Sequence, residues 1–172
     1  MKDFLRLALI LFLFCGVSAG LLAFFNQFTK DRIEAQAAEE KSAALRTVFP
    51  AATDFRETDP GKRWDALKGA DKAGTVFQVS PMGYSGRIEA VCGLDAAGKV
   101  TGIRVLSHTE TAGLGAKITT AAFQDQFRGK AVAELALKKD GGAIDAIAAA
   151  TISSRAVTNA VRAGAAAQGG TK

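Results

Sequence analysis

Apolar residues dominate the start of the chain. Residues 5–25 form a nearly uninterrupted run of apolar or small residues, and Arg6 carries the only charge in it. A helix of about 20 residues rises about 30 Å, which is enough to cross the hydrocarbon core of a bilayer. Lys2 and Arg6 lie at the start of this run, and the longer part of the chain follows it. The positive-inside tendency therefore predicts a cytoplasmic N-terminus and a domain on the opposite side.

A cleaved signal peptide is the alternative interpretation of this run. Val17, Ser18 and Ala19 supply small residues of the kind found at cleavage sites. The apolar run continues past them to Phe25, however, which is not typical of a cleavage region. The pattern therefore favours a retained anchor at residues 1–28.

A helical pattern follows the anchor. Ile33, Ala37, Ala44 and Val48 fall near one face of a helix that Pro50 ends, which predicts a juxtamembrane helix at residues 29–50. Residues 51–74 are polar and rich in turn formers, and we expect loops with a short turn of helix there.

Strand patterns begin at residue 75. Residues 75–79 form a first apolar strand, and Ile88, Ala90, Cys92 and Leu94 alternate along residues 87–94. A turn at 95–98 and a further strand at 99–106 complete a predicted β-hairpin. An amphipathic helix is expected at 117–127, and another begins near Ile152.

These patterns predict an α+β fold. A single transmembrane helix is followed by one domain at residues 51–168, in which an antiparallel sheet is flanked by helices. Residues 169–172 are expected to form a frayed tail.

Composition narrows the chemistry. The net charge of the 172 residues is +5, but acids and bases are mixed and no basic block is present, so no nucleic-acid partner is expected. The chain contains two cysteines and one histidine, His108, and the cysteines show no CxxC or CxxCH spacing. These residues do not supply a set of metal ligands, so no metal site is predicted. Any redox chemistry must use an organic cofactor.

Thr151 stands at the predicted start of the last helix, with Ser153 and Ser154 in the first turn. Unpaired N–H groups and the helix dipole favour a phosphate at such a place. The Thr151 hydroxyl could itself be joined to that phosphate. The alternative is an ordinary N-cap threonine at the start of a surface helix.

A second candidate segment is the loop at residues 107–115. Gly113 and Gly115 allow the backbone to approach a flat ring closely, because glycine has no side chain. The alternative is a plain turn between a strand and a helix. A helix start that can bind a phosphate, together with a glycine loop that can accept a planar ring, indicates a site for flavin mononucleotide (FMN).

Four segments of the chain together resemble FMN-binding domains of membrane redox pumps. They are residues 84–86, 107–118, 123–127 and 145–157, in that order along the chain. Within that family the chain is most similar to the G subunits of Rnf ferredoxin–NAD oxidoreductase complexes. The related C subunits of the sodium-translocating NADH–quinone reductase are generally longer.

The resemblance implies a covalent flavin. In the family, a magnesium-dependent flavin transferase joins FMN by a phosphoester to the threonine of an Asp-x-x-(Ser/Thr)-Gly-Ala-Thr motif. Asp145, Ala150 and Thr151 match the aspartate, the alanine and the flavinylated threonine, and Ser153 and Ser154 match the hydroxyl pair that follows.

The chain departs from the family pattern at three positions. Ala148 replaces the usual Ser/Thr, Ala149 the usual Gly, and Ala112 a usual proline. If the glycine position requires a positive φ, alanine is strained there.

The loop supplies the remaining predicted cofactor-binding residues. We expect Glu110 and Thr111 to hydrogen-bond the flavin ring or its ribityl chain, and Leu114 to pack on the ring. Gly113 and Gly115 let the backbone approach, and Lys117 is expected to stabilise a reduced, anionic flavin. No catalytic side chain is predicted, because electron transfer is the chemistry of the cofactor.

The resemblance also implies the setting. The chain would be the electron-transfer subunit of a bacterial inner-membrane complex that couples electron flow between ferredoxin and NAD to movement of Na⁺ or H⁺. Its FMN domain would be periplasmic, and its partners would be an iron–sulfur subunit and a second FMN-bearing subunit. The alternatives are a membrane-anchored assembly or binding subunit with a decayed or non-covalent flavin site, and a flavin domain that feeds another respiratory acceptor.

Overall fold

The computed structural model describes residues 2–169, with the backbone alone at residues 2, 31 and 34. One compact unit ends at Glu40 and a second begins at Lys41. Of the predicted tail, residues 170–172 lie outside the described part of the chain, and Gly169 lies in a turn.

Helix α1 spans Lys2–Val48. The most apolar 18-residue stretch of its segment Asp3–Lys30 has a mean hydropathy of 2.6, and this segment is the one in residues 2–169 that is long and apolar enough to cross a membrane. The sequence predicted separate helices on either side of residue 28, whereas α1 continues without a break. The hydroxyl of Thr29 donates to the carbonyl of Phe25 at 2.8 Å, which satisfies this polar side chain within the helix.

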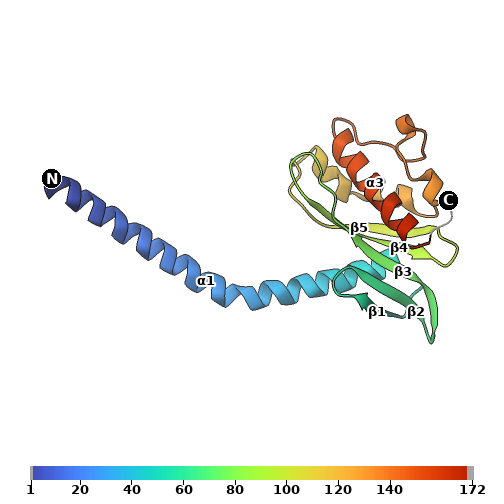
Figure 1. Ribbon diagram of the computed structural model, residues 1–172, viewed down its shortest axis with the longest axis horizontal. Coiled ribbons are helices and arrows are strands. Elements are labelled where there is room, and N and C mark those ends of the chain that lie inside the picture. The colour runs from blue at the N-terminus through green and yellow to red at the C-terminus, as the bar shows by residue number, and fades with distance from the viewer. Residues whose placement is uncertain (1, 170–172) are drawn as a thin grey trace. The chain divides into compact units, whose positions relative to one another are not determined.

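Five antiparallel strands form one sheet in the order β1-β2-β3-β4-β5, so each strand pairs with its neighbour in sequence. The sheet confirms the predicted fold class (Figure 1). The strands are β1 Asp54–Asp59, β2 Arg63–Lys68, β3 Asp71–Val79, β4 Ile88–Asp95 and β5 Val100–His108.

Strands β1 and β2 correct the prediction of loops and a helical turn at residues 51–74. Turns at Gly61 and Gly69, with φ of +72° and +66°, connect β1 to β2 and β2 to β3. Strand β1 is largely exposed, and Trp64 and Ala66 are the buried residues of β2. Two buried positions give little of the alternation from which a strand is recognised in sequence.

The predicted hairpin at residues 87–106 is present as β4 and β5. Its turn is held by the carboxylate of Asp95, which accepts hydrogen bonds from the backbone N–H groups of Ala97 and Lys99 at 2.9 and 2.8 Å. The strands pair Cys92 with Ile103.

The helix predicted at residues 117–127 is wrong as a single element. Short helices replace it, because the hydroxyls of Thr119 and Thr120 donate to the carbonyls of Ala116 and Lys117 and stabilise a tighter turn there. These elements are the 3₁₀ helix Gly115–Thr119, α2 Ala121–Gln124 and the 3₁₀ helix Asp125–Phe127. Further 3₁₀ turns at Val132–Glu134 and Lys138–Asp140 precede the last helix, α3, at Thr151–Ala167.

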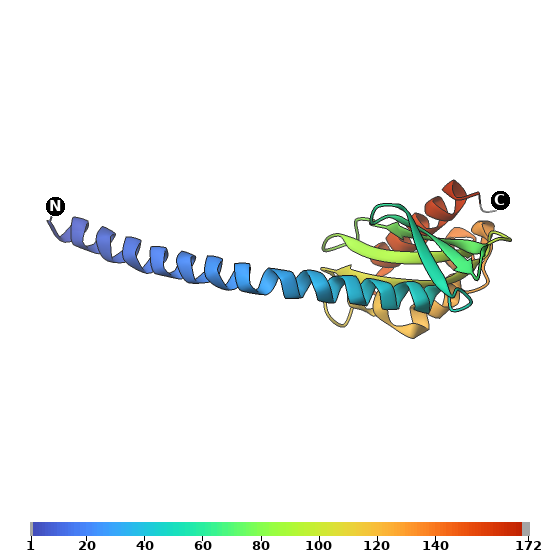
Figure 2. The same ribbon diagram turned by 90° about the horizontal axis from the view of Figure 1, so that it is seen from below.

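The sheet is covered on both faces. Helix α3 packs on one face and the last turns of α1, from Lys41 onward, pack on the other (Figures 1 and 2). Side chains alternate accordingly, since Phe77 and Cys92 belong to the core under α3, whereas Val76 and Val91 belong to the core under α1. The middle of the sheet is therefore buried from both sides.

The end of α1 fits closely on the sheet because glycines leave room for it. A Cβ at Gly74 would collide with the ring of Phe49, and a Cβ at Gly102 would come within 3.2 Å of the carbonyl oxygen of Val48. That carbonyl accepts a hydrogen bond of 2.6 Å from the Thr101 hydroxyl. Phe49 is only 3% exposed.

We expect Phe49→Ala to lower the free energy of unfolding of the domain by about 3–5 kcal/mol, because it leaves a cavity between the end of α1 and the sheet. Phe49→Leu keeps most of the apolar volume and should cost less than about 1.5 kcal/mol. Chemical denaturation of the full chain in detergent measures both. Equal stability of the alanine and leucine variants would show that the ring does not support this junction.

Candidate functional site

One cavity brings together three segments of the second unit. Its volume is about 450 Å³, within the range of small-molecule sites. It lies between the turn before β4, the loop after β5 and the start of α3. Its lining residues are Tyr84, Glu110, Thr111, Leu114, Gly115, Ala149, Ala150, Thr151, Ile152 and Ser153.

The start of α3 carries no side-chain cap. Ala150 is the N-cap residue, with φ −133° and ψ 40°, and a methyl group cannot accept a hydrogen bond from the first turn. The first N–H groups of a helix have no partner within the helix. Together with the helix dipole, they favour an anion at this end of the cavity.

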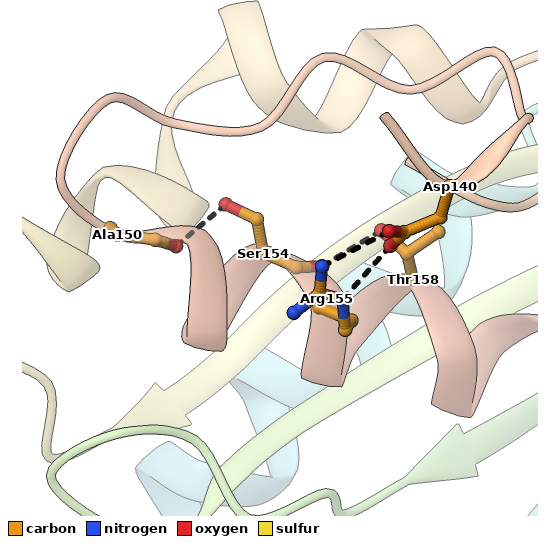
Figure 3. A network of polar contacts seen from close by, with 5 residues as sticks. All are labelled: Asp140, Ala150, Ser154, Arg155 and Thr158. Carbon is orange, nitrogen blue, oxygen red and sulfur yellow. Dashed lines mark hydrogen bonds and ion pairs between the residues drawn. The ribbon is translucent and has the colours of Figure 1, made fainter. Parts of the chain in front are cut away.

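Two of the three hydroxyls in this turn are already engaged by the protein. Ser153 Oγ donates to the carboxylate of Glu110 at 2.6 Å. Ser154 Oγ donates to the carbonyl of Ala150 at 2.9 Å (Figure 3). It also accepts from the N–H of Ile147 at 3.1 Å. Ser154 is fully buried and holds the preceding turn onto the helix.

The third hydroxyl belongs to Thr151, which lines the cavity and is partly exposed. Within the part of the chain that the structure describes, this hydroxyl makes no hydrogen bond. Thr151 thus offers a free hydroxyl at an uncapped helix start, whereas the hydroxyl protons of Ser153 and Ser154 are committed to Glu110 and Ala150.

The turn that leads into α3 is strained at Ala149. This residue has a φ of +62° and is the one non-glycine residue with a positive φ in residues 2–169. A left-handed conformation costs an L-residue about 1–2 kcal/mol. The family pattern has glycine at this position, and the backbone retains the conformation that glycine would adopt without strain.

A salt bridge holds the segment before this turn. Arg155 Nε and Nη2 donate to the two oxygens of Asp140 at 2.9 and 3.1 Å, and this bidentate pair joins α3 to the 3₁₀ turn at 138–140 (Figure 3). These hydrogen bonds hold the pKa of Asp140 below its ordinary value. The segment 141–150 is therefore fixed at both ends.

Glu110 joins the three segments of the cavity. It is 8% exposed, and its two oxygens accept hydrogen bonds from Ser153 Oγ at 2.6 Å and from the backbone N–H of Ser85 at 3.0 Å. The sequence predicted a contact from Glu110 to the flavin, and the structure places both of its carboxylate oxygens on protein donors. Its own backbone N–H donates to Nδ1 of His108 at 3.2 Å.

Apolar side chains surround the mouth of the cavity. Among residues 41–169, the exposed large apolar side chains are Met82, Tyr84, Leu114 and Ile152. Tyr84, Leu114 and Ile152 line the cavity, and Met82 is two residues from Tyr84. An apolar patch on an otherwise polar surface commonly marks a binding site.

Most of the residues predicted from the sequence meet at this cavity. Four do not line it. Asp145 pairs with Lys138 at 2.7 Å, Ser154 is buried behind the helix start, Gly113 has the φ of +77° that its turn requires, and Lys117 is exposed. The roles predicted for these four residues remain predictions.

Tyr84, Ala149 and Ile152 also line the cavity but were not named as binding residues. Tyr84 lies in a segment on which the family resemblance rests, and Ala149 is a departure from the motif, so the sequence carried a signal for both. Ile152 had none beyond being an apolar residue in the first turn of an amphipathic helix.

Comparisons with known proteins point in one direction. The protein-family model for the FMN-binding domain matches residues 83–166, and the family model for the RnfG N-terminal region matches residues 1–48. The G subunit of the ion-translocating oxidoreductase complex of Methanosarcina acetivorans is 35% identical, with 93% of this chain and 92% of that protein covered. The corresponding G subunit of Pseudomonas aeruginosa is 36% identical, with 93% and 86% covered.

A solved structure supports the fold. The C subunit of the Na⁺-translocating NADH–quinone reductase from Parabacteroides distasonis has a TM-score of 0.51 and 22% identity. The match covers 59% of this chain and 57% of that one. At this level of identity, the likeness concerns the fold of the domain.

We expect Ala149→Gly to stabilise the domain by about 1 kcal/mol, because glycine adopts a positive φ without steric cost. The matched control is Ala148→Gly in the same turn, where φ is not positive. It should be neutral or destabilising, because glycine has more freedom to lose on folding. Thermal unfolding of the full chain decides, and a destabilised Ala149→Gly variant would contradict strain at this residue.

Proposed function

The chain belongs to the G subunits of ion-translocating oxidoreductase complexes, and on that premise we propose that it carries electrons on an FMN joined by a phosphoester to Thr151. The observation that supports covalent attachment is the free hydroxyl of Thr151. It lines the cavity at the uncapped start of α3, where a phosphate is favoured. Neighbouring hydroxyls in the same turn are occupied.

The residues of the cavity fit the rest of the cofactor. The backbone N–H groups at the start of α3 would hold the phosphate that the Thr151 ester brings to them. Tyr84, Leu114 and Ile152 offer apolar surface for a planar ring, and Thr111, whose hydroxyl lies 3.3 Å from that of Ser85, also lines the cavity. Bound FMN supplies the capacity to take up and release one or two electrons.

The open, apolar mouth suits electron exchange with another protein. Tyr84 and Ile152 are 73% and 53% exposed although they line the cavity. A ring held against them stays near the surface, where a partner can approach it. The proposed partners are an iron–sulfur subunit and a second FMN-bearing subunit of the same membrane complex, and the proposed maturation partner is a flavin transferase.

Segment Asp3–Lys30 would anchor the protein in the membrane. Lys2 and Arg6 at its start favour a cytoplasmic N-terminus, which places the FMN domain on the periplasmic side of a bacterial inner membrane. A covalent bond would keep the cofactor on the protein in that compartment. Ion movement, of Na⁺ or H⁺, belongs to the whole complex.

A non-covalent flavin site is the second candidate, and the strained turn supports it. Ala149 and Ala148 replace the glycine and the hydroxyl residue of the motif that a flavin transferase recognises in the family. A chain that the transferase does not modify would retain the cavity and bind FMN reversibly.

Flavin fluorescence on a denaturing gel, after co-expression with a flavin transferase, separates the two. Wild type should give a fluorescent band and an intact mass increased by one FMN less one water, and Thr151→Ala should abolish both. Ser153→Ala is the matched control, because its hydroxyl is engaged with Glu110, and it should remain fluorescent. A dark wild-type band, or a fluorescent Thr151→Ala band, would refute attachment at Thr151.

A further inference from the structure

Glu110 is a buried carboxylate without a cationic partner. Its side chain lines the cavity and the residue is 8% exposed, yet no lysine, arginine or histidine in residues 2–169 forms an ion pair with it. Its two hydrogen bonds come from neutral donors, the Ser153 hydroxyl and the backbone N–H of Ser85. Burial of a charge is costly unless other groups stabilise it.

These donors keep Glu110 ionised. Burial alone raises the pKa of the carboxyl, but the hydrogen bonds from Ser153 and from the backbone of residues 84–86 together outweigh burial and lower the pKa below its ordinary value. The positive end of the α3 dipole acts in the same direction, because Ser153 lies in the first turn of that helix.

The surrounding backbone fixes the position of this charge. Glycines at 83 and 115 lie against the carboxylate, and a Cβ at either one would collide with its oxygens. The loop after β5 and the turn before β4 thus close around Glu110. The carboxylate of Glu110 is thereby held at one position in the wall of the cavity.

We propose that Glu110 is a positioning residue that places a fixed negative charge in the wall of the flavin cavity and thereby lowers the reduction potential of the FMN held there. The inference rests on the proposed function. The hydrogen bonds of Glu110 could also be made by a glutamine, so the charge is what distinguishes this residue. A negative charge at the wall disfavours the addition of electrons to a neighbouring ring.

The test is a redox titration of the flavin in the full chain, in detergent at neutral pH. Glu110→Gln is isosteric and retains both contacts, because the Ser153 hydroxyl can rotate to accept from the amide. We expect the variant to favour reduced over oxidised FMN about tenfold more than wild type, a positive shift of about 30 mV for a two-electron couple.

One control separates this charge from charge elsewhere on the chain. Glu39→Gln removes an exposed carboxylate from the first unit and should keep the wild-type potential. An unchanged potential in Glu110→Gln, or an equal shift in Glu39→Gln, would overturn the proposal.

A second measurement uses the chain without flavin. Because the pKa of Glu110 is lowered on folding, its contribution to stability is complete above the unfolded pKa of about 4.3 and is lost as the pH falls through the folded value. Unfolding curves from pH 7 to pH 3 should therefore show a steeper loss of stability in wild type than in Glu110→Gln.

The two measurements distinguish the possible failures. Parallel pH curves would refute Glu110 as a buried anion, whatever the state of the flavin. A wild-type chain that binds no FMN would refute the proposed function and the effect on the potential with it, while a steeper wild-type curve would still identify the buried charge.

Discussion

The carboxylate of Glu110 is the contact on which the shape of the cavity depends. Its hydrogen bonds reach Ser85, which is 25 residues earlier in the chain, and Ser153, which is 43 residues later. The apolar core brings these three segments near one another, because Ile88, Ile118 and Val157 belong to one cluster. The buried charge fixes the point at which they meet, because an ionised carboxylate in a protein interior must be surrounded by donors. The cavity is the space that remains beside this contact, and Thr151 opens into it.

The sheet supplies the rigid base for that arrangement. Its central strands are buried on both faces, with Phe77 in the core under α3 and Val76 in the core under the end of α1. The loop with Glu110 leaves the end of β5, and the turn with Ser85 precedes β4, so both begin from strands that are fixed from two sides. A side chain placed at such points keeps its position well, which a site that must hold a redox cofactor at a constant potential requires.

Sequence patterns predicted the elements whose residues alternate clearly between apolar and polar positions. The β4–β5 hairpin and α3 are of this kind, and Thr151 could be placed at a helix start because the apolar stripe of α3 begins just after it. Strands β1 and β2 were missed because Phe55 is the one apolar residue of β1, and only Trp64 and Ala66 alternate in β2. The helix predicted at 117–127 failed because the Thr119 and Thr120 hydroxyls bond locally to the backbone. The partners of Glu110 lie far away in sequence, and no local pattern encodes them.

The same site is better suited to a tethered cofactor than to tight reversible binding. Its mouth is open, Tyr84 and Ile152 are largely exposed, and the carboxylate in its wall offsets part of the attraction that the start of α3 exerts on an anionic phosphate. Tight reversible binding would require a closed pocket and complementary charge. Under the proposed function, the ester at Thr151 removes that requirement, because a tethered ligand has a high effective concentration at its site. The cavity can then leave the ring accessible to a partner and place a negative charge beside it, two properties that serve electron transfer at the expense of affinity.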